Sequence, residues 1–456
     1  MGRLRLPLVV SHVMSDYGMV LVLLLLCVFY SYVTWDEQHP TDVEGAKKII
    51  NLITREFSQG ATVLVVARDH QQDVAFADLV QTQLSEFGLK VLITIKGHPI
   101  DARDALVTLA RSGNRLDIIA CNDVTARWAV FDNLGTKFPS LSGARILKPP
   151  SHWWPNFLKR DNLLNIANQI SVIAILAIGM TMVIITAGID LSVGSLIALS
   201  AVMSTWLIRE AASAETTSSL GIVLCCLAAV IVCGILGVFS GFMVTLFAIP
   251  PFIATLGMML VASGLAYILA EGQSVYQVPD SFVWLGRSAD LFSIPNAVLL
   301  MLTLYLAAHL MMSQTPLGRY IYAVGGNPEA ARLSGVPIRT VLILVYTICA
   351  VLAGLGGVVM ASQLKSGSPT YGLMYELYTI AAVVVGGASL SGGEGKIFGT
   401  LIGAFIIAVI QNGMNLTGVE GYTQKVVLGM VILGAVLLDM IKKRQWSRLL
   451  QRAGKP

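Results

Sequence analysis

The chain has 456 residues, of which 55% are hydrophobic and 13% are charged, about half the charged share of a typical soluble domain. These values exclude an ordinary soluble enzyme and a disordered chain, and they favour an integral membrane protein. The net charge of +4 is too small to indicate nucleic acid as a partner.

Residues 1–35 are predicted to form a short tail and a first transmembrane helix. The basic residues Arg3 and Arg5 precede an apolar run from Tyr17 to Trp35. The run is long for a signal peptide and ends without a cleavage site of small residues. We therefore expect an uncleaved first span.

Residues 36–150 are predicted to form a small α/β domain inserted after this first span. Fifteen of the 31 basic residues and 15 of the 27 acidic residues lie between Asp36 and Asp161. The expected strands cover 61–67, 89–95 and 116–121, and the expected helices cover 43–57, 73–87, 101–111 and 124–134. Strands that alternate with helices in this way are typical of a parallel sheet.

Residues 151–441 are predicted to form a membrane domain of further apolar spans. The runs lie at 170–187, 191–208, 220–247, 252–270, 294–312, 338–362, 377–390, 397–416 and 423–441. With the first span they make about ten transmembrane helices, and the shortest runs are also compatible with broken or re-entrant helices. The expected fold class is thus a polytopic α-helical membrane protein with a small α/β insert.

The distribution of basic residues predicts the orientation of these spans. If the termini are cytoplasmic, 12 Lys or Arg residues fall on the inside and four on the outside, leaving out the insert. Such a bias is typical of cytoplasmic loops. We therefore expect a multi-pass protein of the cell inner membrane, with both termini and a basic tail at 442–456 in the cytoplasm. The insert would be extracytoplasmic.

The connection between residues 315 and 339 is predicted to contain a short capped helix. Asn327 suits the N-cap and Pro328 the first helical position. Glu329 would lie in the first turn, where the helix dipole favours an anion, and Gly335 can end the helix. Such a helix could dock in a groove on a partner, and a solvated loop with a stray helical turn is the alternative.

Several stretches resemble known permeases. Glu329-Ala330-Ala331, with Gly335 four positions later, resembles the coupling loop of bacterial ABC-importer permeases. The segments at 161–166, 179–199 and 386–416 are similar to the ribose-type sugar permease family. The resemblance assigns ATPase coupling to a loop made of Gly325, Gly326, Asn327, Glu329, Ala330, Ala331 and Gly335.

The resemblance implies a membrane permease subunit, in contact with lipid, that imports a ribose-like monosaccharide. It implies a homodimer, a separate ABC ATPase and a periplasmic sugar-binding protein as partners. The chain itself would be no enzyme and would need no cofactor or metal. Leu390–Glu394 is similar to a signature of ABC ATPases, but the sequence has no GxxxxGK[ST] phosphate-binding loop.

Four polar residues of the membrane domain are candidates for the substrate path: Asp190, Gln411, Asn412 and Asn415. An acid between apolar runs is a functional candidate, although Asp190 could equally cap the following helix. The three amides could bind sugar hydroxyls, and they could also join helices to one another.

The insert has a resemblance of its own. Residues 61–134 resemble part of one lobe of the periplasmic sugar-binding proteins, and this resemblance implies Asn122 and Asp123 as ligand residues. Ligands bind at strand ends in open α/β sheets. The insert has only one lobe, however, so a degenerate or docking domain is the alternative.

Two other classes of protein remain as alternatives. A membrane receptor could sense a ligand through the insert, but only 15 residues follow Ile441, too few for a cytoplasmic output domain. An ion-coupled secondary transporter usually has ionisable groups inside its spans. The predicted spans contain almost none.

Overall fold

The computed structural model describes residues 5–210, 218–434, 436 and 437. The predicted basic tail at 442–456 lies outside the described residues. The chain divides into two compact units, one of residues 1–34 and 156–456 and the other of residues 35–155.

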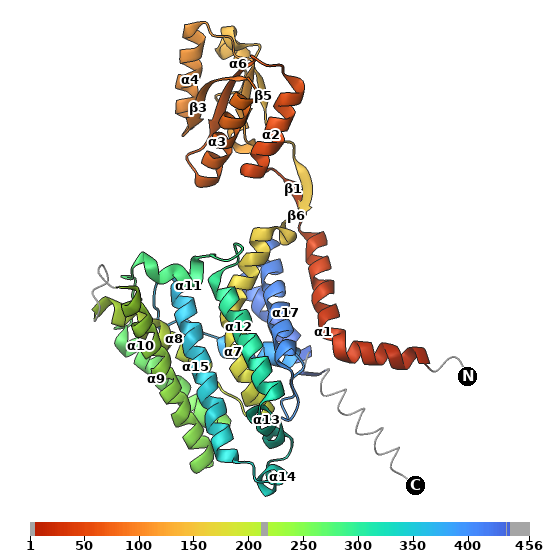
Figure 1. Ribbon diagram of the computed structural model, residues 1–456, viewed down its shortest axis with the longest axis vertical. Coiled ribbons are helices and arrows are strands. Elements are labelled where there is room, and N and C mark those ends of the chain that lie inside the picture. Colours follow the sequence, from red (N-terminus) through yellow and green to blue (C-terminus); the bar gives the residue numbers. More distant parts are fainter. Residues whose placement is uncertain (1–4, 211–217, 435, 438–456) are drawn as a thin grey trace. The chain divides into compact units, whose positions relative to one another are not determined.

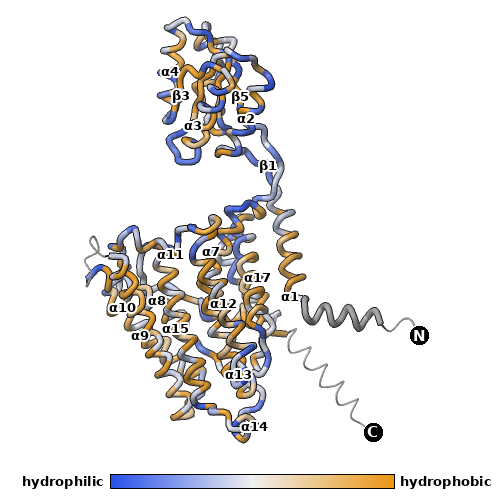
Figure 2. The backbone as a smooth tube through the Cα atoms, viewed as in Figure 1, coloured by the Kyte–Doolittle hydropathy of each residue, from blue (hydrophilic) through white to orange (hydrophobic). Residues whose placement is uncertain are grey.

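The first unit consists of apolar helices (Figures 1 and 2). Seven described helices are long and apolar enough to cross a membrane: α7 (Arg160–Ile185), α8 (Val193–Glu210), α9 (Ser219–Leu246), α10 (Pro251–Leu269), α12 (Asn296–Gln314), α15 (Ile338–Leu364) and α17 (Ile397–Leu416). Residues Gly18–Val33 of α1 (Arg5–Val33) and α16 (Tyr375–Val385) are shorter apolar helices. The predicted polytopic helical membrane fold is thereby confirmed, and the count of ten spans stays a prediction.

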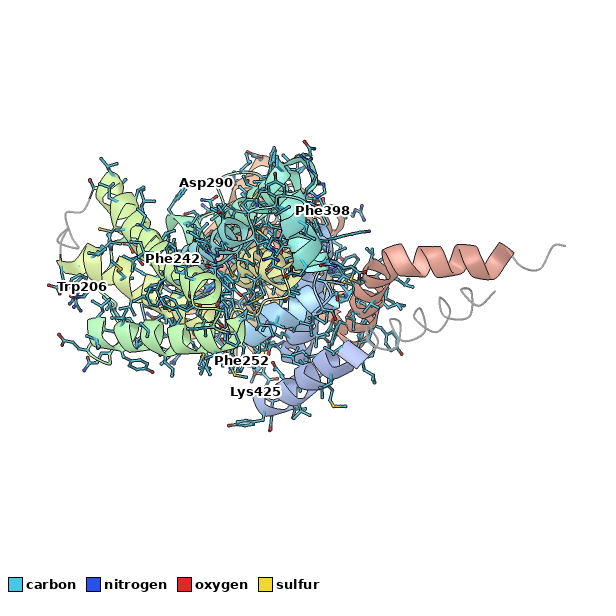
Figure 3. The ribbon with its side chains drawn as sticks, turned by 90° about the horizontal axis from the view of Figure 1, so that it is seen from below. Trp206, Phe242, Phe252, Asp290, Phe398 and Lys425 are labelled. Carbon is cyan, nitrogen blue, oxygen red and sulfur yellow. The ribbon has the colours of Figure 1, made fainter. Side chains whose placement is uncertain are left out.

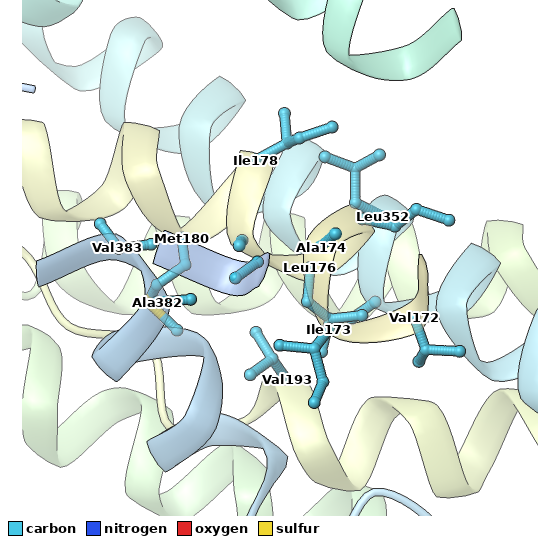
Figure 4. Packing of buried hydrophobic residues seen from close by; sticks show 14 of the residues in the cluster. Val172, Ile173, Ala174, Leu176, Ile178, Met180, Val193, Leu352, Ala382 and Val383 are labelled. Atoms are coloured by element: carbon cyan, nitrogen blue, oxygen red, sulfur yellow. The ribbon is translucent and has the colours of Figure 1, made fainter. Parts of the chain in front are cut away.

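Helix α7 occupies the centre of this unit. It packs against α12, α15, α16 and α17, and every residue from Ile170 to Ile185 is buried. Figure 4 shows Ile173 and Leu176 of this helix near Val193 and Leu352 of neighbouring helices. A helix that is apolar all round is typical of a protein core or a membrane span, and α7 is surrounded by other helices.

Helices α9 and α10 instead expose much of their apolar surface. Phe242 and Phe252, labelled in Figure 3, are 39% and 52% exposed. Continuous exposed apolar surface of this kind marks contact with lipid or with another chain.

Helix α16 is the shortest of the apolar helices, with 11 residues. At 1.5 Å per residue it rises about 16 Å, roughly half the thickness of the hydrocarbon core. Its C-terminal end meets the start of α17, where a Cβ on Gly399 would strike the carbonyl of Gly386. The two helices are antiparallel neighbours, so Tyr375 lies about halfway along α17.

The second unit is a four-stranded parallel sheet in the order β3-β2-β4-β5. Its strands are β2 (Thr62–Ala67), β3 (Lys90–Lys96), β4 (Ile118–Cys121) and β5 (Arg145–Leu147). Helices α2 (Val43–Glu56) and α3 (Gln71–Glu86) cover one face of the sheet, and α4 (Pro99–Ser112) covers the other.

Some elements of this unit differ from the prediction. The predicted helix at 124–134 is wrong: the segment contains α5 (Asp123–Ala126), and α6 (Leu134–Lys137) begins only at its last residue. Asn133 adopts a left-handed conformation with φ of 54°, which a continuous helix does not allow. Strand β5 and an antiparallel pair, β1 (Trp35–Gln38) with β6 (His152–Pro155), were not expected from the sequence.

Candidate functional site

The expected coupling helix is α14 (Pro328–Leu333), which follows α13 (Pro316–Gly326) directly. The Oδ1 atom of Asn327 accepts a hydrogen bond of 3.0 Å from the backbone N–H of Ala330. Glu329 lies in the first turn and forms a 3.0 Å ion pair with Arg332. The local sequence thus produces the capped helix that it predicts.

The C-terminal end of α14 is also closed by hydrogen bonds. The N–H of Val336 donates to the carbonyl of Ala331, and the N–H of Gly335 donates to that of Arg332, both at 3.0 Å. These two bonds form a Schellman motif, which needs a left-handed residue. Gly335 supplies it with φ of 82°, and no other atom lies near the position that a Cβ would take.

The outer surface of α14 is not covered by any of the residues that the structure describes. Leu333 is 84% exposed, and the charged side chains of Glu329 and Arg332 extend into solvent. Ala331 is buried and holds the helix to the membrane unit. One exposed leucine with an acid and a base beside it forms a small surface suited to docking on a partner.

Helix α13 is joined to the rest of the unit through close backbone contacts at Gly325. A Cβ on Gly325 would strike the carbonyl oxygen of Ile185 and would lie 2.7 Å from the N atom of Gly393. The Gly393 N–H donates a 2.8 Å hydrogen bond to Ile185. The hydroxyl of Tyr322 donates a 2.7 Å hydrogen bond to the carbonyl of Gly395.

These contacts identify a three-part junction of α13, the end of α7 and the turn between α16 and α17. The turn contains the Leu390–Glu394 stretch that is similar to an ATPase signature. Its glycines pack against Gly325 and Gly326. Sequence reasoning missed this contact because the partners are far apart along the chain.

The Asp190 carboxyl is buried in the connection between α7 and α8. Its Oδ1 atom accepts hydrogen bonds from the N–H of Ser192 at 2.9 Å and from the Ser192 hydroxyl at 2.6 Å. This geometry supports the view that Asp190 shapes the turn into α8.

The three amides of α17 have different surroundings. Asn412 exchanges two hydrogen bonds with Asn162 of α7, at 2.8 and 3.1 Å, so it joins two helices. The Oδ1 atom of Asn415 accepts a 2.7 Å hydrogen bond from Gln424. Of these three amides, only that of Gln411 lines a cavity.

This first cavity, of about 230 Å³, is bounded by α7, α15, α16 and α17. Its polar wall consists of Gln169, Gln363, Gln411 and Tyr375. Amide groups both donate and accept hydrogen bonds, which suits a sugar. The structure does not bring the four predicted path residues together, and it adds Gln169 and Gln363, whose amides also donate hydrogen bonds to Asn165 and Asn168 of α7.

In the insert, Asn122 and Asp123 lie at the carboxyl end of β4. The buried Asn122 amide donates a 3.0 Å hydrogen bond to Asp73 and accepts one of 2.9 Å from the N–H of Thr125. Asp73 also forms a 2.6 Å ion pair with Arg68. Asn122 therefore supports the local structure of the strand end.

Asp123 is surrounded by basic side chains. Its carboxylate lies 2.6 Å from Lys148, 2.7 Å from Arg127 and 3.5 Å from the Nδ1 atom of His39. Burial alone would raise the pKa of Asp123, but the hydrogen bond from Lys148 and the surrounding charges lower that pKa below its usual value. A sugar would have to compete with these cations, which favours the docking alternative for the insert.

The family model described as branched-chain amino acid transport system / permease component matches residues 162–436. The ribose import permease protein of Escherichia coli K12 is 44% identical over 293 residues, which are 63% of this chain and 88% of the relative. The ribose import permease protein of Bacillus subtilis 168 is 41% identical over 290 residues, or 63% and 87%.

The L-arabinose transport system permease protein of Escherichia coli K12 is 35% identical over 290 residues, which are 64% of this chain and 86% of the relative. No solved structure matches the chain significantly.

Proposed function

The chain belongs to the family of branched-chain amino acid transport system permease components, and on that premise we propose that it is the permease subunit of an ATP-driven sugar importer. Its expected cargo is a ribose-like monosaccharide, because relatives that are 41–44% identical to it over 290–293 aligned residues are named for ribose import. The structural observation that carries the proposal is α14, a capped helix with an exposed docking surface.

The chain performs no chemistry of its own in this proposal. A separate ABC ATPase hydrolyses ATP and docks on α14, and a periplasmic binding protein delivers the sugar. Two copies of the chain form the channel. No cofactor or metal is needed, because the free energy for transport enters through the docked ATPase and shifts the channel between its states.

The junction at Gly325 explains how docking could reach the membrane domain. A displacement of α14 is passed to α13, whose end touches both Ile185 of α7 and the Gly393 turn. Packed backbone of this kind deforms little. The same displacement therefore moves the helices that line the first cavity, which contains Gln411.

The proposal can be tested with the complete complex in proteoliposomes. Uptake of D-ribose should require the ATPase, the binding protein and ATP, and it should persist when ion gradients are collapsed. Uptake driven by an ion gradient without ATP would instead support a secondary transporter.

The proposed orientation places the insert outside the cytoplasm and α14 inside it. Asn114→Cys, in the exposed connection that follows α4, should react with an impermeant thiol reagent in intact spheroplasts. Leu333→Cys, on α14, should react only after lysis, and the unmodified chain gives the background from its own six cysteines. The opposite pattern would overturn the orientation.

We further propose that residues 36–150 form a domain separate from the permease. Its helices and sheet have their own hydrophobic clusters on both sheet faces. Replacing 36–150 by a short linker should leave a protein that still inserts and dimerises. Aggregation or degradation of this protein would contradict the proposal.

A further inference from the structure

A second cavity, of about 190 Å³, lies between α8, α10 and the connection from α15 to α16. Its polar lining consists of Ser195, Ser263, Tyr267, Thr370, Tyr371 and Glu376. Glu376 is the only acid among the lining residues. The sequence did not indicate it, because the predicted span begins at Leu377.

The depth of Glu376 follows from the length of α16. The residue lies in the first turn of this helix, while the last turn meets the start of α17. The rise of about 16 Å places the carboxyl roughly halfway through a hydrocarbon core of about 30 Å. An ionisable group at that depth is expensive and is a functional candidate by default.

The carboxyl of Glu376 has no basic partner in the described part of the chain. It lies instead against the first turn of α8, where a Cβ on Gly194 would strike its Oε2 atom. The N-terminal turns of α8 and α16 thus meet at this carboxyl. The positive ends of two helix dipoles favour an anion there without a cation beside it.

The groups that line this second cavity indicate the chemical class of ligand that it would bind. A carboxylate only accepts hydrogen bonds, whereas hydroxyls both donate and accept. The hydroxyls of Thr370 and Tyr371 already pair with Ser368 and Ser366, so the ligand would meet chiefly those of Ser195, Ser263 and Tyr267. Two tyrosine rings supply apolar faces. A neutral sugar offers many O–H donors and apolar ring faces and carries no charge. It therefore complements this cavity better than an anion would.

We propose that Glu376 and the hydroxyls around it form a transit site that holds the neutral sugar in the middle of the membrane. Glu376 accepts hydrogen bonds from two sugar hydroxyls there, and Tyr267 contributes a further hydroxyl. The inference rests on the proposed function and extends it by naming where, and by which groups, the sugar is held.

The test uses the complete complex in proteoliposomes, with labelled D-ribose, D-allose and L-arabinose as probes. Glu376→Gln should slow uptake of the transported sugar at least tenfold, which corresponds to about 1.4 kcal/mol. Glu376→Asp should lose less, because it keeps the carboxylate. Glu420→Gln, an exposed acid outside the cavity, is the matched control and should stay within twofold of the wild type.

A structural role for Glu376 is separated from a sugar contact by deoxy analogues. Removing the contacted hydroxyl from the sugar should slow the wild type, and the additional effect of Glu376→Gln should then disappear for that analogue. An equal loss for every analogue would overturn the inference, as would unchanged uptake.

A milder pair of variants keeps the test decisive if Glu376→Gln does not reach the membrane. Tyr267→Phe should slow uptake, whereas Tyr276→Phe, which lies outside the cavity, should not. Equal uptake by both variants would overturn the inference.

If the wild type moves none of the three sugars, the proposed function fails and the transit site fails with it. If Glu376 proves to bind a coupling cation, uptake will follow an ion gradient without ATP, and the transit site is again refuted.

Discussion

The end of α14 allows a test in which a single methyl group is added. Gly335 has φ of 82°, and a Cβ there would meet nothing within 4 Å. Gly335→Ala therefore creates no clash, and its whole effect lies in the backbone conformation. An L-residue in the left-handed region costs about 1–2 kcal/mol. We expect the Schellman motif of Gly335 and Val336 to weaken by that amount.

Most of the conformational free energy that Gly335→Ala costs should appear as weaker binding of the ATPase to α14. Helix α14 has only six residues, and a helix of that length is marginal without its caps. A loss of about 1–2 kcal/mol lowers the population of the docking conformation by a factor of roughly 5–30. The apparent affinity for the ATPase falls by the same factor, because only that conformation binds.

Two other glycines of the same loop provide comparison variants, one expected to be neutral and one expected to disturb a different contact. A Cβ on Gly326 would also meet nothing within 4 Å, but this residue is helical, so Gly326→Ala should leave docking unchanged. Gly325→Ala would press against Ile185. We expect it to disturb the junction and to lower transport even where the ATPase still binds.

The assay is a titration of the purified ATPase onto each variant in lipid nanodiscs, followed by sugar-stimulated ATP hydrolysis. The reasoning predicts weaker binding for Gly335→Ala and normal binding for Gly326→Ala. If Gly335→Ala binds within twofold of the wild type, docking does not depend on the end of α14. If both variants lose binding equally, added bulk and not conformation is responsible.

Three further predictions concern other contacts. Glu329→Lys removes an ion pair and places a cation at a helix N-terminus, at a cost of about 0.3–1 kcal/mol; it should weaken ATPase binding without lowering the amount of protein in the membrane. Asn412→Ala leaves its amide partner on α7 without the reciprocal hydrogen bonds, so the thermal midpoint in detergent should fall by the equivalent of about 1–3 kcal/mol, with ATPase binding unchanged. Asp123 has a pKa below its usual value in the folded insert, so its ion pairs contribute stability above about pH 4 that is lost as the pH falls through the lower folded value. Asp123→Asn should therefore destabilise the insert at pH 7 and flatten its acid dependence, measured as protease resistance in urea; an unchanged pH profile would contradict this account.

The sequence predicts α14 well because all the residues that shape it lie within the helix or beside it. Asn327 accepts from Ala330, Pro328 begins the helix, and Gly335 ends it. Each of these interactions spans a few residues, so the residue types alone specify the helix. The apolar runs of the membrane unit are similarly local signals.

The contacts that give polar residues their roles are not local. Asn412 and its partner Asn162 are 250 positions apart, and Gly393 meets Gly325 from 68 positions away. No pattern of residue types predicts such pairs. Asp190 and Asn415 have nearer partners, Ser192 and Gln424, and of the four path candidates only Gln411 lines a cavity.

Glu376 shows a different limit of sequence reasoning. The predicted span begins at Leu377, one residue after this acid, so the sequence did not mark Glu376 as a candidate. In the structure α16 begins at Tyr375, after a connection that folds back along α8, and Glu376 lies in its first turn. Gly372 lies against Gly194 there. The carboxyl is half-buried and lines the second cavity, and this placement depends on contacts with α8 that the local residue pattern does not carry.

The junction and the transit site are the two ends of one rigid element, since α16 runs from Glu376 to the turn that touches α13. In the proposed mechanism a movement of α14 would therefore reach the transit site through a helix of about 16 Å. The Tyr322 hydroxyl contributes one hydrogen bond to this path, to Gly395 at 2.7 Å. Tyr322→Phe removes that bond, worth about 0.5–1.5 kcal/mol, without touching α14. It should leave ATPase binding intact and lower the ratio of sugar-stimulated to basal hydrolysis by roughly two- to tenfold. Tyr320→Phe is the matched control, because it also removes a tyrosine hydroxyl from α13 but at an exposed position away from the junction. If both variants keep the wild-type ratio, the coupling does not pass through this turn.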